Sequence, residues 1–249
     1  MKLKLIDLLI YLLLFIFVVS LPVDLLNLPI DYELDILIGL RAALLIFFIY
    51  IIWKNKIKVF EKSLNKEILL FLPFFLICFN NFIASFISGG FDSLSDGYIL
   101  FLEILLCLIG AILEEIVFRL FIQNSLENKT PIVRIILSAT IFALFHFINV
   151  VNVRSVLAFI NVLIQVVYTF GLGLAIAFIY EYSRSFAMVV LLHFFFNLLN
   201  DVLYGFLQGF SSNLAFILTS VIMALLAVSY GVIIYLTKFK KSDSKEQEQ

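Results

Sequence analysis

Eight apolar stretches, each long enough to cross a lipid bilayer as a helix, fill most of the 249-residue chain. A helix that crosses the hydrocarbon core needs about 20 consecutive apolar residues. Inside hydrocarbon, every backbone N–H and C=O must be bonded within the protein, which leaves only helices and closed barrels. The sequence therefore predicts an all-α polytopic membrane bundle of about eight transmembrane helices. The expected spans are residues 5–27, 34–53, 68–87, 98–125, 131–150, 156–181, 185–207 and 213–236.

The connections between these spans alternate in charge. Lysine and arginine collect before the first span, after the second, after the fourth (Lys129 and Arg134), after the sixth (Arg184) and in the C-terminal tail, whereas acidic residues follow the first and third spans. Cytoplasmic loops are rich in lysine and arginine. We therefore expect a multi-pass cell-membrane protein with both termini in the cytoplasm, which agrees with an even number of spans. Arg154 is the one loop cation on the opposite side.

No linker, internal repeat or second soluble domain is visible, so we expect one integral membrane domain. Its parts are N-terminal helices in residues 1–97, a core in 98–207, and a last helix with a polar tail in 208–249. The lipid bilayer is the expected surrounding. With 14% charged residues and a net charge of −1, the chain has no basic field that would attract nucleic acid. The high phenylalanine, isoleucine and lysine content favours an AT-rich genome, such as that of a Gram-positive bacterium.

One apolar segment, GAILEEIVFRLFI at residues 110–122, contains three charged side chains. An ionisable residue inside a membrane is costly and by default indicates a functional site with a partner to be named. Positions four apart share a helix face, so Glu115 and Arg119 are predicted to form a structural ion pair. Glu114 points about 100° away from Glu115. The same helical turn therefore offers one paired carboxylate and one free carboxylate.

Both histidines of the chain, His146 and His193, also lie within apolar segments. Phe142 precedes His146 by four residues and Asn197 follows His193 by four, so each pair shares a helix face. A single intramembrane histidine is often a packing residue, but two of them with a free glutamate favour a functional site. At about 1.5 Å per residue, Glu114 and both histidines lie roughly 13 to 22 Å from their cytoplasmic helix ends. They can therefore converge.

A glutamate, two histidines and an asparagine around a cavity that holds water are the groups needed to hydrolyse an amide bond. The carboxylate can take a proton from water, and a histidine can share that water or bind a metal that acidifies it. The second histidine and the asparagine amide can donate hydrogen bonds to a developing oxyanion. Glu103 lies about three helical turns before Glu114 and points to nearly the same side of the helix. It either lines the same cavity or pairs with a residue such as Arg41.

The order Glu114-Glu115-xxx-Arg119, Phe142-xxx-His146 and His193-xxx-Asn197 resembles the CPBP family of CaaX proteases and bacteriocin-processing enzymes. The resemblance covers roughly residues 98–205 and implies a helical bundle whose cavity opens toward the cytoplasmic leaflet. It implies that Glu114 activates water with His146, and that His193 and Asn197 form the oxyanion hole. It leaves the cofactor open: none tightly bound, or one divalent metal such as zinc on Glu114, His146 and His193.

The favoured function is an intramembrane endopeptidase that hydrolyses peptide bonds in membrane-associated peptides or membrane proteins. Prenylated CaaX substrates are not expected in a Gram-positive bacterium, so peptide precursors, bacteriocins or regulators are the expected substrates. The alternative is a non-catalytic immunity or regulatory protein of the same family that binds a membrane partner. A proton-conducting transporter is the third candidate, although the inverted repeats or broken helices typical of that class are not visible. The role of residues 1–97, which carry no family motif, stays open.

Overall fold

The computed structural model describes residues 3–59, 73–74, 78–79, 97–202 and 213–239. This part of the chain is helical and contains no β-strand, which confirms the all-α class. Its α-helices are α1 (Leu5–Val19), α2 (Ile30–Lys54), α4 (Gly97–Glu115), α5 (Pro131–Phe145), α6 (Val156–Ser183), α7 (Phe186–Asn197) and α9 (Asn213–Ile234).

Seven of the eight expected spans coincide with these helices. The remaining one, 68–87, lies almost wholly outside the described residues, so the total of eight stays a prediction. Three helical segments are both long and apolar enough to cross a membrane: Ile30–Lys54, Pro131–Val151 and Val156–Ser183. The chain is therefore a membrane protein that contains at least these spanning helices.

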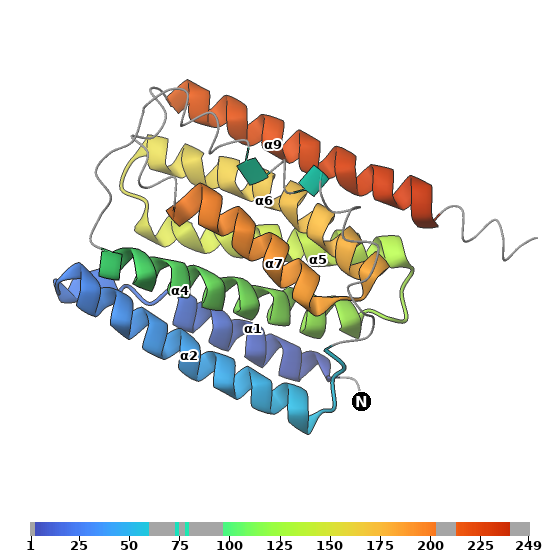
Figure 1. The fold of residues 1–249 in the computed structure, drawn as a ribbon, viewed down its shortest axis with the longest axis horizontal. Coiled ribbons are helices and arrows are strands. Elements are labelled where there is room, and N and C mark those ends of the chain that lie inside the picture. Colours follow the sequence, from blue (N-terminus) through green and yellow to red (C-terminus); the bar gives the residue numbers. More distant parts are fainter. Residues whose placement is uncertain (1–2, 60–72, 75–77, 80–96, 203–212, 240–249) are drawn as a thin grey trace, which may run out of the picture.

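The helices lie side by side in an elongated bundle (Figure 1). Helix α6 packs against both α5 and α9, and α2 packs along α4, which in turn contacts α7. Large apolar side chains such as Leu13, Trp53 and Leu225 are more than half exposed on the outside. Because hydrocarbon solvates such side chains as well as a protein core does, this surface suits a bilayer.

Small residues on α6 let its neighbours approach closely. A Cβ atom on Gly171 would lie 2.8 Å from the backbone oxygen of Ala224 on α9, and one on Gly173 would lie 2.9 Å from the ring of Phe142 on α5. Contacts this close leave no room for a methyl group, as is common where membrane helices pack through small residues. Gly173 thus makes space for the Phe142 ring, which lies under both histidines.

Three α-helices change their winding next to the residues that the sequence singles out. A π-helical segment, Ile116–Gln123, follows Glu115 directly, a 3-10 segment begins at His146, and a second π-helical segment follows Asn197. The hydrophobic pattern predicted uninterrupted helices over 98–125, 131–150 and 185–207, so these changes are a correction. Single turns of π-helix are frequent at functional sites, because the wider turn re-aims nearby side chains.

A buried polar cluster joins α5 and α6 at one end of the bundle. Arg134 and Arg184 both form ion pairs with Glu181, and Gln123 donates a hydrogen bond to the same carboxylate at 3.2 Å. The sequence placed both arginines among the cytoplasmic loop cations. In the structure the side chain of Arg134 points inward and is about nine-tenths buried, so it stabilises the bundle in addition to any role in topology.

Candidate active site

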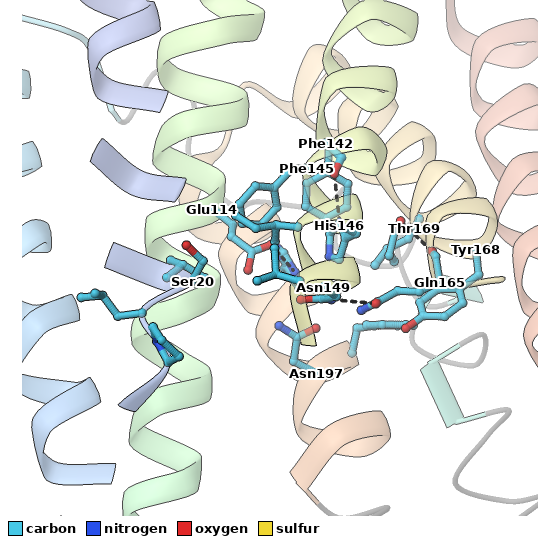
Figure 2. Close-up of a pocket in the computed structure, with 18 residues that line it drawn as sticks. Ser20, Glu114, Phe142, Phe145, His146, Asn149, Gln165, Tyr168, Thr169 and Asn197 are labelled. Atoms are coloured by element: carbon cyan, nitrogen blue, oxygen red, sulfur yellow. Dashed lines mark hydrogen bonds and ion pairs between the residues drawn. The ribbon is translucent and has the colours of Figure 1, made fainter. Parts of the chain in front are cut away.

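A cavity of about 270 Å³ collects the four residues that the sequence proposed as catalytic. Glu114 from α4, His146 at the end of α5, and His193 and Asn197 from α7 all line it. Figure 2 shows Glu114, His146, Asn149 and Asn197 pointing into this shared space. Residues that lie about 80 positions apart in the chain thus meet at one point of the bundle.

Glu115 and Arg119 form the ion pair expected from their spacing. Arg119 Nε donates to Oε2 of Glu115 at 2.9 Å, and both side chains are fully buried. Arg119 Nη1 also donates to the hydroxyl of Ser138 at 2.8 Å, and its guanidinium lies 5.6 Å from the centre of the Phe142 ring. These contacts compensate most of the cost of burying the charge and tie α4 to α5.

The other oxygen of Glu115 has a partner that the sequence analysis did not anticipate. Nδ1 of His193 lies 2.8 Å from Oε1 of Glu115. Because a carboxylate only accepts, the Nδ1 atom carries the proton and Nε2 points toward the cavity. Glu115 therefore connects the buried cation of Arg119 to the orientation of His193, which is more than the structural pairing assigned to it from spacing. No sequence signal links positions 115 and 193.

Glu114 presents its carboxylate to the cavity. Its Oε2 atom is buried, forms no hydrogen bond with any part of the chain that the structure describes, and lies 3.6 Å from Nε2 of His193. A buried polar atom without a hydrogen bond is costly, so this oxygen is suited to bind a water molecule or a polar group of a substrate. Glu114 is thus the less constrained of the two adjacent carboxylates, as the helix geometry predicts.

The orientation of His146 follows from a single backbone contact. Its Nδ1 atom lies 3.0 Å from the carbonyl oxygen of Phe142, and a carbonyl only accepts, so Nδ1 is the protonated nitrogen. Nε2 of the neutral ring then keeps its lone pair for a water in the cavity. The ring of Phe142 packs edge-on against both His146 and His193, with ring centres 5.0 and 5.7 Å apart.

Polar groups from α6 and from the segment after His146 complete the lining. Asn149 donates a hydrogen bond to Gln165 at 2.8 Å, and Gln165, Tyr168 and Thr169 face the cavity (Figure 2). Asn149 was not among the residues expected at the site, although a carboxamide three residues after His146 in an apolar stretch is a usable signal. The end of α1 also contributes Ser20 to the lining, which only the folded structure reveals.

Glu103 lies outside this cavity. It lines a second cavity of about 360 Å³ together with Arg41, Cys107 and Gly110, and Glu114 and Asn197 line both cavities. Glu103 and Arg41 do not form an ion pair with each other in the described part of the chain. Glu114 thus lies between two adjoining cavities.

The donors around the first cavity have the chemistry of a zinc site, but their arrangement differs from one. Both histidines engage Nδ1 with an acceptor and keep Nε2 available, which is how histidine ligands of zinc are usually held. Among the described residues, however, no group of three histidine, cysteine, aspartate or glutamate side chains converges closely enough to hold a metal ion. The three candidate ligands Glu114, His146 and His193 therefore do not fit a metal as they stand, and we derive the chemistry from protein groups and water.

Comparison with known proteins assigns the central part of the chain. Residues 96–199 match the family described as Type II CAAX prenyl endopeptidase Rce1-like. This segment begins just before α4, ends just after Asn197 and contains all three motifs, so the match confirms the resemblance that those motifs indicate. No curated protein and no solved structure matches the chain.

Proposed function

We propose that this protein is an intramembrane endopeptidase that uses Glu114 to activate water. The observation that carries the proposal is the buried Oε2 atom of Glu114, which forms no hydrogen bond within the described part of the chain and lies 3.6 Å from Nε2 of His193 in a polar cavity inside an apolar bundle. The Rce1-like match of residues 96–199 supports a membrane protease in general. The roles of the individual residues are those that the family resemblance implies, and the contacts around the cavity support them.

In the first step, a water bound between Glu114 and Nε2 of His146 attacks the carbonyl carbon of the peptide bond. The Glu114 carboxylate takes one proton from this water, and His146 Nε2 accepts a hydrogen bond that orients the other. The new C–O bond produces a tetrahedral oxyanion. When the C–N bond then breaks, Glu114 returns its proton to the departing amine, so the enzyme ends in its starting state.

In this proposal His193 and Asn197, which both line the cavity, stabilise the oxyanion. Asn197 can donate through its carboxamide N–H groups. His193 already gives Nδ1–H to Glu115, so a second donation from Nε2 requires the imidazolium form. Glu115 at 2.8 Å and Glu114 at 3.6 Å are the two carboxylates that would pair with that cation. Donors fixed in advance at the oxyanion are usually worth several kcal/mol.

The decisive experiment compares wild type with Glu114→Gln in a deletion strain, at matched membrane levels of the two proteins. The substitution keeps the volume of the side chain but removes its basicity. Mass spectrometry of membrane and secreted peptides should show one precursor that accumulates only in the deletion and Glu114→Gln strains. If both alleles restore the same peptides and the same phenotype, the endopeptidase proposal fails and the immunity or regulatory function replaces it.

We further propose that the protein crosses the cell membrane several times and has both termini in the cytoplasm. Its substrate is a membrane-associated peptide or a membrane protein. If the protein instead has the immunity or regulatory function, it binds a membrane partner and does not cleave it.

A further inference from the structure

Arg41 is a partly buried cation in a membrane helix, and no carboxylate forms an ion pair with it in the part of the chain that the structure describes. It lies near the middle of α2, and its Nε atom is buried without a hydrogen-bond partner. No ion pair or hydrogen bond joins Arg41 to the residues that the structure describes. Arg119, by contrast, is equally intramembrane and is paired with Glu115. A guanidinium at bilayer depth is expensive unless an anion or a water-filled cavity accompanies it.

The surroundings of Arg41 show where such an anion would sit. Arg41 lines the 360 Å³ cavity that Glu114 and Asn197 also line. Its Nη1 atom lies against Gly110, where a Cβ atom would approach to 3.4 Å. Because Gly110 precedes Glu114 by four residues on α4, the guanidinium lies about one helical turn from the catalytic carboxylate. The other charged group in this lining is Glu103.

We propose that Arg41 binds a carboxylate of the substrate and thereby selects which peptides reach Glu114. This inference rests on the proposed endopeptidase function and deepens it. A guanidinium can hold a carboxylate through two parallel N–H···O bonds, which gives both strength and direction. When the carboxylate of a peptide is held by Arg41, the peptide bond that lies beside Glu114 is only a few residues away from that carboxylate.

Two groups of a peptide present the same chemistry to Arg41. One is the C-terminal carboxylate, and the other is the side chain of an aspartate or glutamate residue. In either case the substrate supplies a carboxylate in direct contact with Arg41, which Glu103 and Glu114 of the same cavity do not. The competing explanation is structural: a water-bridged pair of Arg41 with Glu103, which would need no ligand.

Thermal unfolding of the full-length protein in nanodiscs, with three probe peptides, separates these possibilities. The probes are N-acetyl-Leu-Leu-Leu with a free carboxylate, the same peptide as a C-terminal amide, and N-acetyl-Leu-Leu-Asp-amide. A ligand about 100-fold above its Kd raises the Tm of a protein of this size by about 5 to 10 °C. We expect that shift from the free acid or from the aspartyl amide, or from both, but not from the trileucine amide. Which acid acts identifies the source of the carboxylate.

The variants test whether Arg41 is responsible. Arg41→Gln should abolish the shift and, without peptide, should leave the Tm unchanged or raise it because an unpaired buried charge is removed. Arg41→Lys should weaken the shift because lysine lacks the two-pronged geometry. Glu103→Gln is the matched control and should respond to the acid like wild type.

Three outcomes of the peptide-binding measurements overturn the inference. They are equal shifts from the acids and the trileucine amide, no shift from either acid up to its solubility limit, and a shift that survives in Arg41→Gln. A similar loss of Tm in peptide-free Arg41→Gln and Glu103→Gln overturns it too, because that result shows a structural pair. Since these readouts measure binding, they are independent of hydrolysis: if the acids bind through Arg41 but no precursor accumulates in the Glu114→Gln strain, only the endopeptidase proposal fails.

Discussion

Nδ1 of His193 donates to Oε1 of Glu115 at 2.8 Å, across 78 positions of the sequence. The other oxygen of the same carboxylate accepts from Arg119 at 2.9 Å. Glu115 therefore fixes the orientation of a cavity histidine while it neutralises a buried cation. These two roles have different consequences for stability and for activity, and substitutions can separate them.

Removal of Glu115 alone should damage both properties. Glu115→Ala leaves Arg119 buried and unpaired, for which a loss of about 3 to 5 kcal/mol is expected. The double variant Glu115→Leu/Arg119→Met replaces the pair by apolar side chains of similar volume, a change that is often neutral for stability. We expect the double variant to regain the wild-type unfolding midpoint in nanodiscs but not peptide processing, because His193 has lost its orienting acceptor. Recovery of processing together with stability would show that Glu115 has no positioning role.

The function of His146 can be removed while its packing is kept. In His146→Phe an aromatic ring can still pack against Phe142, but the lone pair of Nε2 is lost. We expect normal membrane levels and a thermal midpoint close to wild type, with processing reduced about 100- to 10,000-fold, the usual contribution of a positioned acid or base. Accumulation of the precursor in a complemented deletion strain measures the effect. Wild-type processing by this variant would remove His146 from the mechanism.

The sequence predicted the composition of the site better than its geometry. Glu114, His146, His193 and Asn197 were recognisable because charged and polar side chains inside apolar spans are costly and therefore rare. The link between Glu115 and His193 was not recognisable, since it depends on how α4 and α7 pack. Spacing on a helix reports only on neighbours within the same helix.

The changes in winding escaped prediction for a related reason. The π-helical segment Ile116–Gln123 is apolar at six of its eight positions and looks like ordinary helix to any hydrophobic pattern. Residues of this segment make contacts with other helices, among them the hydrogen bond that Arg119 donates to Ser138 on α5. Such contacts between helices leave no trace in the hydrophobic pattern. Asn149 and Ser20 reach the cavity through backbone turns that follow α5 and α1. Such positions are set by loop and cap geometry rather than by amphipathic periodicity.

Two glycines of α6 should respond differently to the addition of a methyl group. At Gly171 the new Cβ would meet a backbone oxygen of Ala224 at 2.8 Å, and backbone cannot move aside cheaply. We expect Gly171→Ala to separate α6 from α9 and to cost about 1 to 3 kcal/mol. At Gly173 the new Cβ would meet the ring of Phe142 at 2.9 Å, and a ring can shift.

Gly173→Ala should therefore cost less stability than Gly171→Ala but more activity, because Phe142 supports His146 and His193. Unfolding midpoints in nanodiscs and the processing rate per folded molecule measure the two effects. The opposite ranking, with activity lost only in Gly171→Ala, would show that the Phe142 ring does not hold the histidines in place.

The cluster around Glu181 should behave as a purely structural element. Glu181→Gln would leave the buried Arg134 and the partly buried Arg184 without their shared carboxylate. Leaving buried Arg134 unpaired costs about 3 to 5 kcal/mol, so the variant should unfold at a distinctly lower temperature and reach lower membrane levels. The molecules that do fold should process substrate at the wild-type rate, because the cluster does not line the catalytic cavity. Glu127→Gln is the comparison variant: Glu127 is exposed, and the substitution keeps the backbone carbonyl that accepts a hydrogen bond from Arg134 at 3.2 Å. Because interactions of exposed carboxylates are worth little, this variant should lose far less stability than Glu181→Gln. A loss of processing per folded Glu181→Gln molecule would instead show that this end of the bundle is coupled to the site.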